Sequence, residues 1–342
     1  MKKIKVGNRL VGEGEPCFIV AEAGSNHDGK LSQARELVDV AVEAGADAVK
    51  FQIYSAETLY SKKTPKFSTS EKPPWELIKK IETPREWIPD LKEYCDKKGI
   101  IFFATPFDFN AVDELDPYVD LYKVASFEIV DLSLIEYIAR KQKPTIISTG
   151  LANMEEIEDA YLTYTKTGND KLVFLQCASV YPAPPEIMNL RSMKTIRDSF
   201  GVITGLSDHT LGIYISVAAV AMGAKVIEKH FTLSRKLKGP DHPFAIEPNE
   251  LKEMVKEIRD VEKALGNGKK LGPSAQELEN YKKARRSIHA KVNIPKGTRI
   301  TNDMLIIKRP GYGIKPKFIN IVIGREARKN IEEDQWITWD VI

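Results

Sequence analysis

The sequence predicts an α/β protein in which a (β/α)8 barrel is followed by a small, mostly β domain. The first observation is that short apolar runs alternate with amphipathic runs along most of the chain, a pattern typical of parallel strands joined by helices. Eight such units close naturally into a barrel, whereas an open doubly wound sheet usually has fewer strands. The eight strand-like runs are residues 17–21, 48–52, 100–104, 121–124, 145–148, 172–177, 202–206 and 226–230.

A second observation excludes the main competing fold. Open α/β sheets that bind nucleotides carry a glycine-rich fingerprint at their first turn. Neither GxGxxG nor GxxxxGK[ST] occurs at that turn in this sequence. The amphipathic runs that we expect to cover the barrel as helices are residues 31–44, 84–98, 131–140, 154–167, 190–200, 213–222 and 249–265.

The connection after the second predicted strand is unusually long. Residues 53–83 are rich in Lys, Ser and Pro and precede the next predicted helix. A long loop at the carboxyl end of a barrel strand is usually a lid or a substrate rim, and the alternative is a solvated insertion.

The chain is expected to divide into a barrel at residues 1–268, a linker at 269–283 and a small domain at 284–342. The linker is polar and contains glycine, as flexible connections do. The last segment has short β-branched runs broken by PKGTRITND and KRPGYGI, which predicts short strands between turns. A domain of under about 60 residues is marginal alone, so we expect it to dock on another surface.

Charge and cysteine content limit the partners and the compartment. Lys and Arg total 51 against 48 acidic residues, a formal charge of +3, which argues against nucleic-acid binding and against a membrane surface. The sequence has no apolar run of about 18 residues and no leader-like N-terminal segment. Three cysteines at distant positions, Cys17, Cys95 and Cys177, favour a reducing compartment over a disulfide scaffold. We therefore expect a cytoplasmic protein.

Two histidines mark the ends of the last two predicted strands. His209 lies just beyond the run at 202–206, and His230 ends the run at 226–230. The carboxyl ends of parallel strands meet at one face of a barrel, so two imidazoles there can converge on one divalent cation. A hydrogen-bonded core role is the alternative for an isolated histidine, and the repeated pattern favours the metal.

Lysines and hydroxyls follow the other strands. Lys50 and Lys123 lie at strand ends, where burial is costly unless an anion neutralises them. Together with nearby hydroxyls they could bind a phosphate and a carboxylate in one pocket. Lysines that extend out of the barrel mouth are the alternative. The hydroxyl residues are Thr105, Ser126, Ser148, Ser179 and Ser207.

At these residues the sequence resembles the sialic acid synthase family of nonulosonic acid synthases. The resemblance covers nearly the whole chain, in order. It implies a TIM barrel joined to an antifreeze-like (SAF) domain, and condensation of phosphoenolpyruvate with an N-acylated amino-hexose such as N-acetylmannosamine, with a divalent metal, Mn²⁺ or Mg²⁺. The motifs are AEAGSNHDG, VKFQ, ATPFD, YKVASFEI, STG, YPAPPE, GLSDHTLG, EKHFTL, GPDH, RRSIHA and KRPGYGI.

The resemblance also implies residue roles. The metal ligands would be His209 and His230, and a further catalytic residue would be Glu128, as acid or base. The residues that hold phosphoenolpyruvate would be Lys50, Thr105, Lys123, Ser126, Ser148, Ser179 and Ser207. The residues that contact the sugar or a metal-bound water would be Glu22, Gln52, Tyr181 and Asp241, with Glu22 also counted as catalytic. Arg309, in KRPGYGI, would bind sugar in the partner's barrel within a domain-swapped homodimer.

Several alternatives stay open. Within the family, DLYKVASFEIVDLSLI, RPGYGI and TWDVI resemble pseudaminic acid synthases, whereas VKFQ, EYCDKKGIIFFATPFD and GPDH resemble sialic or legionaminic acid synthases; we favour the latter. A phosphoenolpyruvate-condensing barrel that makes octulosonates or heptulosonates would have no reason for the tail. A non-catalytic sugar-binding protein would need eroded metal and lysine positions, and these positions are intact.

Overall fold

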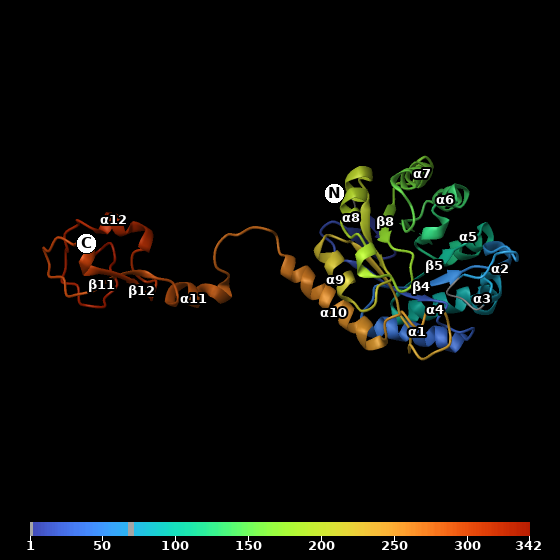
Figure 1. Cartoon of the computed structure of the whole chain (residues 1–342), viewed down its shortest axis with the longest axis horizontal. Coiled ribbons are helices and arrows are strands. Elements are labelled where there is room, and N and C mark those ends of the chain that lie inside the picture. Colours follow the sequence, from blue (N-terminus) through green and yellow to red (C-terminus); the bar gives the residue numbers. More distant parts are fainter. Residues whose placement is uncertain (1–2, 68–71) are drawn as a thin grey trace. The chain divides into compact units, whose positions relative to one another are not determined.

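The computed structural model describes residues 3–67 and 72–342. The chain forms two compact units, Met1–Gly266 and Asn267–Ile342, each of which is described by itself (Figure 1). Residues 68–71, in the middle of the predicted lid or rim, lie outside the described residues.

The first unit is a barrel of parallel strands. Its 8-stranded sheet has the order β5-β4-β3-β10-β9-β8-β7-β6, and adjacent strands in this order pair in parallel. The end strands β5 and β6 lie next to each other, so the barrel is nearly closed. The predicted fold class is thereby confirmed. The strands are β3 (Phe18–Gly24), β4 (Ala48–Ile53), β5 (Ile101–Pro106), β6 (Tyr122–Val124), β7 (Thr145–Ser148), β8 (Leu172–Cys177), β9 (Ile203–Asp208) and β10 (Val226–His230).

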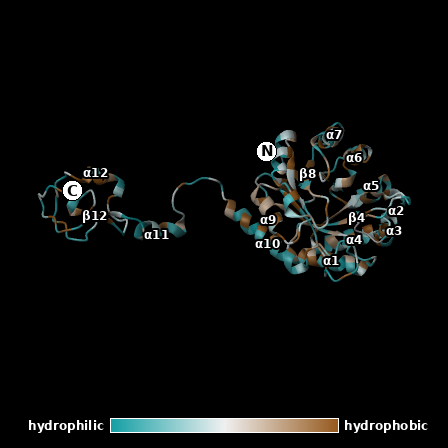
Figure 2. Cartoon of the chain, in the orientation of Figure 1, coloured by the Kyte–Doolittle hydropathy of each residue, from teal (hydrophilic) through white to brown (hydrophobic). Residues whose placement is uncertain are grey.

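Helices surround this sheet (Figure 1). Helix α10 shows why they pack there, since its buried residues Leu251, Met254, Val255 and Ile258 recur at helical spacing and form one apolar stripe. Figure 2 shows hydrophobic and hydrophilic residues together on helices such as α1 and α10. The helices are α1 (Leu31–Ala44), α4 (Ile88–Lys98), α5 (Phe109–Leu115), α6 (Leu132–Arg140), α7 (Met154–Thr165), α8 (Ser192–Phe200), α9 (Tyr214–Ala221) and α10 (Pro248–Leu265).

Three parts of this unit were not predicted. A hairpin of β1 (Lys3–Val6) and β2 (Arg9–Gly12) pairs antiparallel and adds Ile4, Val6 and Val11 to the barrel's core. Helix α5 has 7 residues, too few for a clear helical period. The long connection contains α2 (Ala56–Leu59) and α3 (Pro74–Ile81), so its described part is a folded insertion.

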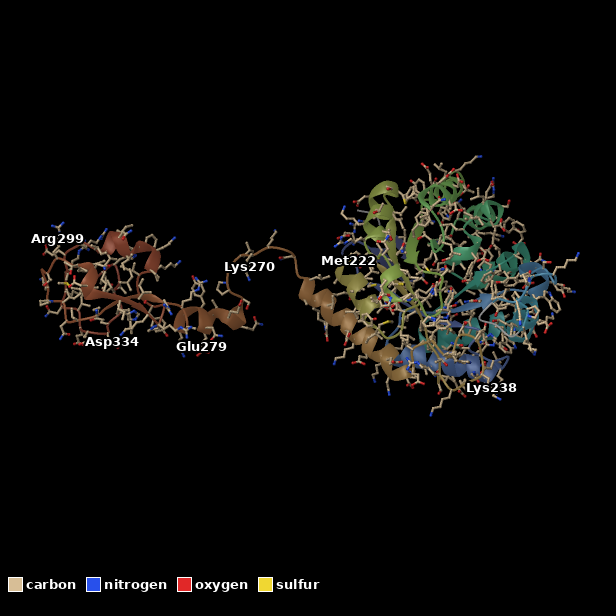
Figure 3. The ribbon with its side chains drawn as sticks, viewed as in Figure 1. Met222, Lys238, Lys270, Glu279, Arg299 and Asp334 are labelled. Carbon is tan, nitrogen blue, oxygen red and sulfur yellow. The ribbon has the colours of Figure 1, made fainter. Side chains whose placement is uncertain are left out.

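The second unit has a core of its own. Strands β11 (Ser287–Ala290) and β12 (Leu305–Lys308) pair antiparallel, and Ile288, Ile300, Val322 and Ile337 are buried between the surrounding turns. Helix α11 (Leu278–Lys283) lies within the predicted linker segment, and α12 (Ile319–Val322) lies in the predicted β domain. Charged side chains such as Glu279 and Asp334 point away from the ribbon (Figure 3).

Short 3-10 turns connect the regular elements. They are η1 (Arg85–Trp87), η2 (Asp116–Tyr118), η3 (Ser126–Glu128), η4 (Pro185–Ile187), η5 (Ala275–Glu277), η6 (Asn302–Met304) and η7 (Pro316–Phe318). Among residues 3–67 and 72–342, no helix combines the length and the apolar composition that crossing a bilayer requires.

Candidate active site

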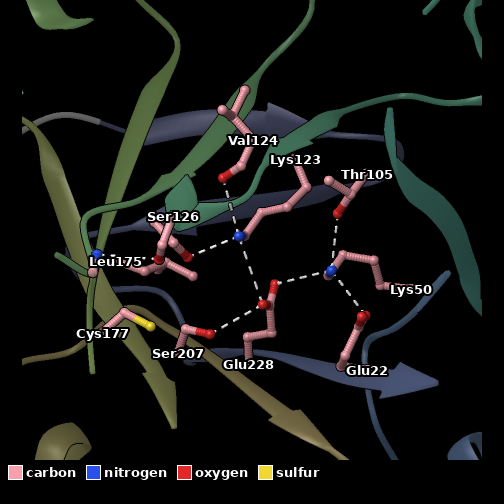
Figure 4. Close-up of polar contacts among 12 residues, drawn as sticks. Glu22, Lys50, Thr105, Lys123, Val124, Ser126, Leu175, Cys177, Ser207 and Glu228 are labelled. Atoms are coloured by element: carbon pink, nitrogen blue, oxygen red, sulfur yellow. Dashed lines mark hydrogen bonds and ion pairs between the residues drawn. The ribbon is translucent and has the colours of Figure 1, made fainter. Parts of the chain in front are cut away.

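A network of charged side chains fills the barrel interior near the carboxyl ends of its strands (Figure 4). Alternate residues of a strand point to opposite faces. Glu228 of β10 lies within ion-pair distance of Lys50 on β4 and of Lys123 on β6. Neither strand is a neighbour of β10 in the sheet, so these side chains must meet inside the barrel.

Lys50 is surrounded by acceptors. Its Nζ lies 2.9 Å from Glu22 Oε2 and 3.8 Å from Glu228 Oε2, and it donates a 3.0 Å hydrogen bond to Thr105 Oγ1. Burial lowers the pKa of Lys50, but the two carboxylates outweigh burial and leave this pKa above its usual value. Lys50 is therefore a fixed positive charge in the barrel.

Lys123 has weaker charge compensation. Its Nζ donates to Ser148 Oγ at 2.7 Å and to the carbonyl of Val124 at 3.1 Å, and it lies 3.7 Å from Glu228 Oε1. Burial lowers the pKa of Lys123, and the opposing effect of Glu228 does not fully compensate. An anion bound beside Lys123 would complete its neutralisation.

Glu228 was not among the predicted site residues. Its Oε1 accepts a 3.1 Å hydrogen bond from Ser207. Burial raises the pKa of Glu228, but Lys123 and Lys50 lower it further, so the net pKa is below its usual value. The available signal was its place in EKH, two residues before His230 and therefore on the same face of β10.

Hydroxyl groups converge beside Lys123. Gly150 N donates to Ser126 Oγ at 3.1 Å, and a Cβ at Gly150 would lie 2.3 Å from Ser179 Oγ and 2.8 Å from Ser126 Oγ. Among the described residues, Ser179 Oγ is buried and has no hydrogen-bond partner. Because Gly150 has no side chain, the hydroxyls of Ser126 and Ser179 can lie close to its backbone. With Ser148 they form a group of hydroxyl donors that suits an oxyanion.

The two histidines do come together. Their ring centroids are 5.5 Å apart. His209 Nδ1 donates to the carbonyl of Ala178 at 2.8 Å, which fixes the tautomer that leaves Nε2 as an acceptor. In the described part of the chain, the buried Nδ1 of His230 has no hydrogen-bond partner, although Asp241 Oδ2 lies 3.7 Å away.

These imidazoles fit a divalent cation. Burial, and then neighbouring positive charges such as that of Lys50, hold the pKa of His230 well below its usual range, so this ring is the neutral form that binds metals. Within residues 3–67 and 72–342, no group of three or more His, Cys, Asp and Glu side chains could hold a metal ion. A cation here would have two imidazole ligands and would keep its other positions for water or substrate.

The residues predicted to contact the sugar lie beside the histidines. The Tyr181 ring packs against His209, tilted by 34° with centroids 4.2 Å apart, and Gln52 donates to Glu22 Oε1 at 2.7 Å. Asp241 also belongs to this cluster, because a Cβ at Gly24 would lie 2.9 Å from Asp241 Oδ2 and 3.5 Å from Glu22 Oε1.

Glu128 lies on η3 at the edge of the lysine network. Burial raises the pKa of this carboxyl to about 7, while the charge of Lys123 opposes the rise. Among the described residues, Glu128 Oε2 is buried without a hydrogen-bond partner. A carboxyl with a pKa near neutrality can exchange protons in either direction.

Arg309 belongs to the second unit, where it is exposed.

Comparisons with known proteins place the chain beside synthases of acidic sugars. Residues 37–270 match the NeuB family and residues 285–342 match the SAF domain. The chain is 41% identical over 342 residues to N,N'-diacetyllegionaminic acid synthase of Legionella pneumophila, covering 97% of this chain and 96% of that protein. The spore coat polysaccharide biosynthesis protein SpsE of Bacillus subtilis is 39% identical, with 100% and 98% covered.

Solved structures agree. The crystal structure of SpsE superposes with a TM-score of 0.70 at 38% identity, covering 100% of this chain and 99% of that one. The N-acetylneuraminic acid synthetase of Leptospira borgpetersenii, crystallised with citrate, gives a TM-score of 0.75 at 38% identity, with 82% and 95% covered.

Replacing Glu228 by Gln should destabilise the barrel in a pH-dependent way. Among the described residues, Lys123 would then have no carboxylate within ion-pair distance, and an uncompensated buried charge costs about 3 kcal/mol or more. The folded variant would release the Lys123 proton at lower pH than the unfolded chain, whose lysines stay protonated to about pH 10. Because the unfolded state binds more protons, stability of the variant rises with pH.

Urea unfolding followed by circular dichroism at pH 7 and pH 9 measures this effect. The free energy of unfolding of Glu228→Gln should lie far below that of the wild type at pH 7 and less far below it at pH 9. Ser207→Ala is the matched control, because it removes a hydrogen bond to Glu228 but no charge. An equal deficit for Glu228→Gln at both pH values would contradict the role assigned to Glu228.

Proposed function

The chain belongs to the NeuB family of phosphoenolpyruvate-dependent synthases, and we propose that it condenses phosphoenolpyruvate with an N-acylated amino-hexose and releases phosphate. The sugar we favour is of the sialic or legionaminic class, with N-acetylmannosamine as the simplest candidate. Pseudaminic acid synthesis is the alternative within the family. The observation that carries the proposal is the pair of buried lysines, Lys50 and Lys123, beside a corner of hydroxyls in the barrel.

Phosphoenolpyruvate suits this charge distribution. It carries a phosphate and a carboxylate, and Lys50 and Lys123 reach the interior from two different strands. We assign the carboxylate and the phosphate to the space between these lysines, with hydroxyl donors completing their hydrogen bonds. The hydroxyl residues are Thr105, Ser126, Ser148, Ser179 and Ser207.

His209 and His230 are proposed to hold a divalent cation, Mn²⁺ or Mg²⁺. When bound, such a cation polarises the aldehyde oxygen of the open-chain sugar and makes its carbon electrophilic. The protein's own part is to orient the sugar, for which Glu22, Gln52, Tyr181 and Asp241 lie beside the imidazoles. The aromatic face of Tyr181 would pack against the sugar, while the polar groups would bind its hydroxyls.

The chemical steps then need a proton acceptor. The methylene carbon of phosphoenolpyruvate attacks the aldehyde carbon, and positive charge develops at the carbon that bears the phosphate. Water adds to that carbon and gives up one proton. The carbon–oxygen bond to phosphate then breaks, phosphate leaves with the bonding electron pair, and the new hydroxyl loses its proton as the keto group forms. One of the two protons released ends on the former aldehyde oxygen, which becomes a hydroxyl, and the other on phosphate or solvent. Glu128 would accept a proton of the water, and Lys50 and Lys123 would stabilise the departing phosphate.

Arg309 is proposed to complete the site from a second copy of the chain. Its guanidinium could donate hydrogen bonds to the N-acyl carbonyl of the sugar. In this arrangement the SAF domain of one protomer serves the barrel of its partner in a domain-swapped homodimer.

Phosphate release across a panel of sugars tests the proposed reaction. Phosphoenolpyruvate should release phosphate with Mn²⁺ and with an N-acylated amino-hexose of the sialic or legionaminic class, and His209→Ala or His230→Ala should reduce this rate to background. Faster turnover with the pseudaminic acid precursor would select that alternative. Full activity in both histidine variants would refute the metal assignment. No phosphate release with any sugar, despite sugar binding, would favour a non-catalytic sugar-binding protein.

The raised pKa of Glu128 predicts how kcat/KM falls on the acidic side of its pH profile. A general base must be deprotonated, so kcat/KM should fall below about pH 7, where burial places the Glu128 pKa. Glu128→Gln should lower kcat by roughly 100-fold or more and should abolish this acidic limb. Glu155→Gln, an exposed carboxyl on the first turn of α7, is the control. An unchanged acidic limb in Glu128→Gln would assign the base to another group.

Mixing two inactive variants tests the role of Arg309. In a domain-swapped dimer each site combines His209 of one chain with Arg309 of the other. A mixed dimer of one His209→Ala chain and one Arg309→Ala chain therefore has one site with both substitutions and one site with neither. Refolding an equal mixture should therefore restore about a quarter of wild-type activity, because half of the dimers are mixed and each has one intact site. Each variant refolded alone is the control. Absence of recovery in mixtures shown by mass spectrometry to contain mixed dimers would place Arg309 in the site of its own chain.

A further inference from the structure

An ion pair lies directly behind the two histidines. Asp208 precedes His209 and Lys229 precedes His230 in the sequence. Lys229 Nζ lies 3.0 Å from Asp208 Oδ2, and the side chains are 1% and 0% exposed. The charged pair is therefore fully enclosed, and the chemistry described above makes no use of it.

The pair lies on the outer face of the barrel sheet. Its neighbours Ser207 and Glu228 face the interior, where they contact each other, so Asp208 and Lys229 must face the helices. Asp208 Oδ2 also accepts a 2.7 Å hydrogen bond from Ser216 on α9, which confirms this direction.

The β9–β10 ladder ends at this pair. Its last partners are Lys229 and Asp208, and His209 lies one residue beyond the end of β9. Strand pairing with β10 therefore does not position the backbone of His209. Its carbonyl oxygen accepts a 2.9 Å hydrogen bond from Ala183 N, and side-chain bonds hold the two residues that flank it.

The ion pair supplies such bonds on both sides of His209. Asp208 Oδ1 accepts from Thr210 N at 2.9 Å and from Thr210 Oγ1 at 2.8 Å. Lys229 Nζ donates to the carbonyl oxygen of Thr210 at 2.5 Å. The residues before and after His209 are thus both tied to the residue that precedes His230.

A purely structural role does not account for charged groups here. A buried ion pair contributes little net stability compared with apolar side chains of similar volume, and apolar residues would join β9 to the helices equally well. The ion pair differs in making directional bonds to one backbone segment, the turn that carries His209.

We propose that Asp208 and Lys229 are positioning residues that set the separation and orientation of the His209 and His230 rings from the opposite face of the sheet. The proposal rests on the proposed role of these histidines in metal binding. It predicts that breaking the ion pair loosens the turn at His209 and weakens divalent-cation binding, although neither residue touches the cation.

Mn²⁺ alone is the probe, with its dissociation constant measured by electron paramagnetic resonance on the full-length chain. Lys229→Met should weaken Mn²⁺ binding by about tenfold, the lower end of the range for groups that orient metal-bound histidines. In metal-free protein, amide hydrogen exchange should accelerate in peptides that cover residues 207–214. Asp208→Asn is a milder variant that should act in the same direction if Lys229→Met folds poorly. The double variant should be no worse than the more severe single variant, because the pair acts as a unit.

The matched control is an ion pair at the other end of the strands. Asp47 lies just before β4, is 4% exposed and pairs with Arg259 at 2.9 Å. Arg259→Met should lower the melting temperature but leave Mn²⁺ affinity and exchange at residues 207–214 unchanged. Equal loss of Mn²⁺ affinity in Arg259→Met and Lys229→Met at matched melting temperatures would overturn the proposal, as would unchanged affinity and exchange in Lys229→Met.

The failure of the metal assignment is distinguishable. If wild-type protein shows no Mn²⁺ affinity that His209→Ala removes, the proposed metal role of the histidines is wrong. Amide hydrogen exchange then tests the positioning role independently of the metal. Faster exchange at residues 207–214 in Lys229→Met but not in Arg259→Met supports that role, and equal exchange in the two variants overturns it.

Discussion

Charge compensation inside the barrel is the constraint on which the site depends. Lysines cannot stay charged in a closed, water-poor interior unless carboxylates or anions lie beside them. Here Glu22 and Glu228 perform this function for Lys50, whereas Lys123 has Glu228 alone within ion-pair distance among the described residues. The network thus holds two ammonium groups in fixed positions, as the anion site proposed above requires.

The alternation of side chains along each strand separates chemistry from support. In β10, Glu228 and His230 point into the barrel while Lys229 points toward the helices, and in β9 Ser207 and Asp208 divide in the same way. The short strand β10 therefore supplies one charged group, Glu228, to the barrel interior and a second, Lys229, to the layer between the sheet and the helices. Because both faces of β10 are covered, all five of its residues are buried, although three of them carry a charged group or an imidazole.

The sequence predicts the parts of this protein that depend on local pattern. The bounds of β7, β8 and β10 were predicted correctly, because continuous apolar runs between turn residues mark buried parallel strands. The convergence of His209 with His230, and of Lys50 with Thr105, followed from their shared place at strand ends. Glu228 was missed because its partners lie on distant strands. The sequence grouped Ser126, Ser148 and Ser179 in one pocket, but it gave no sign that the missing side chain of Gly150 leaves room for Ser126 and Ser179. Such contacts depend on barrel closure, which no local pattern reports.

The two lysines differ in a way that bears on anion binding. Lys50 has a raised pKa and Lys123 a lowered one, although both are buried to the same extent. The difference follows from the second carboxylate, Glu22, which lies beside Lys50. An anion that binds beside Lys123 would raise its pKa toward that of Lys50, so anion binding and proton uptake favour each other. Lys50 is therefore held in its protonated form more firmly than Lys123, and Lys123 is the lysine whose pKa a bound anion would raise.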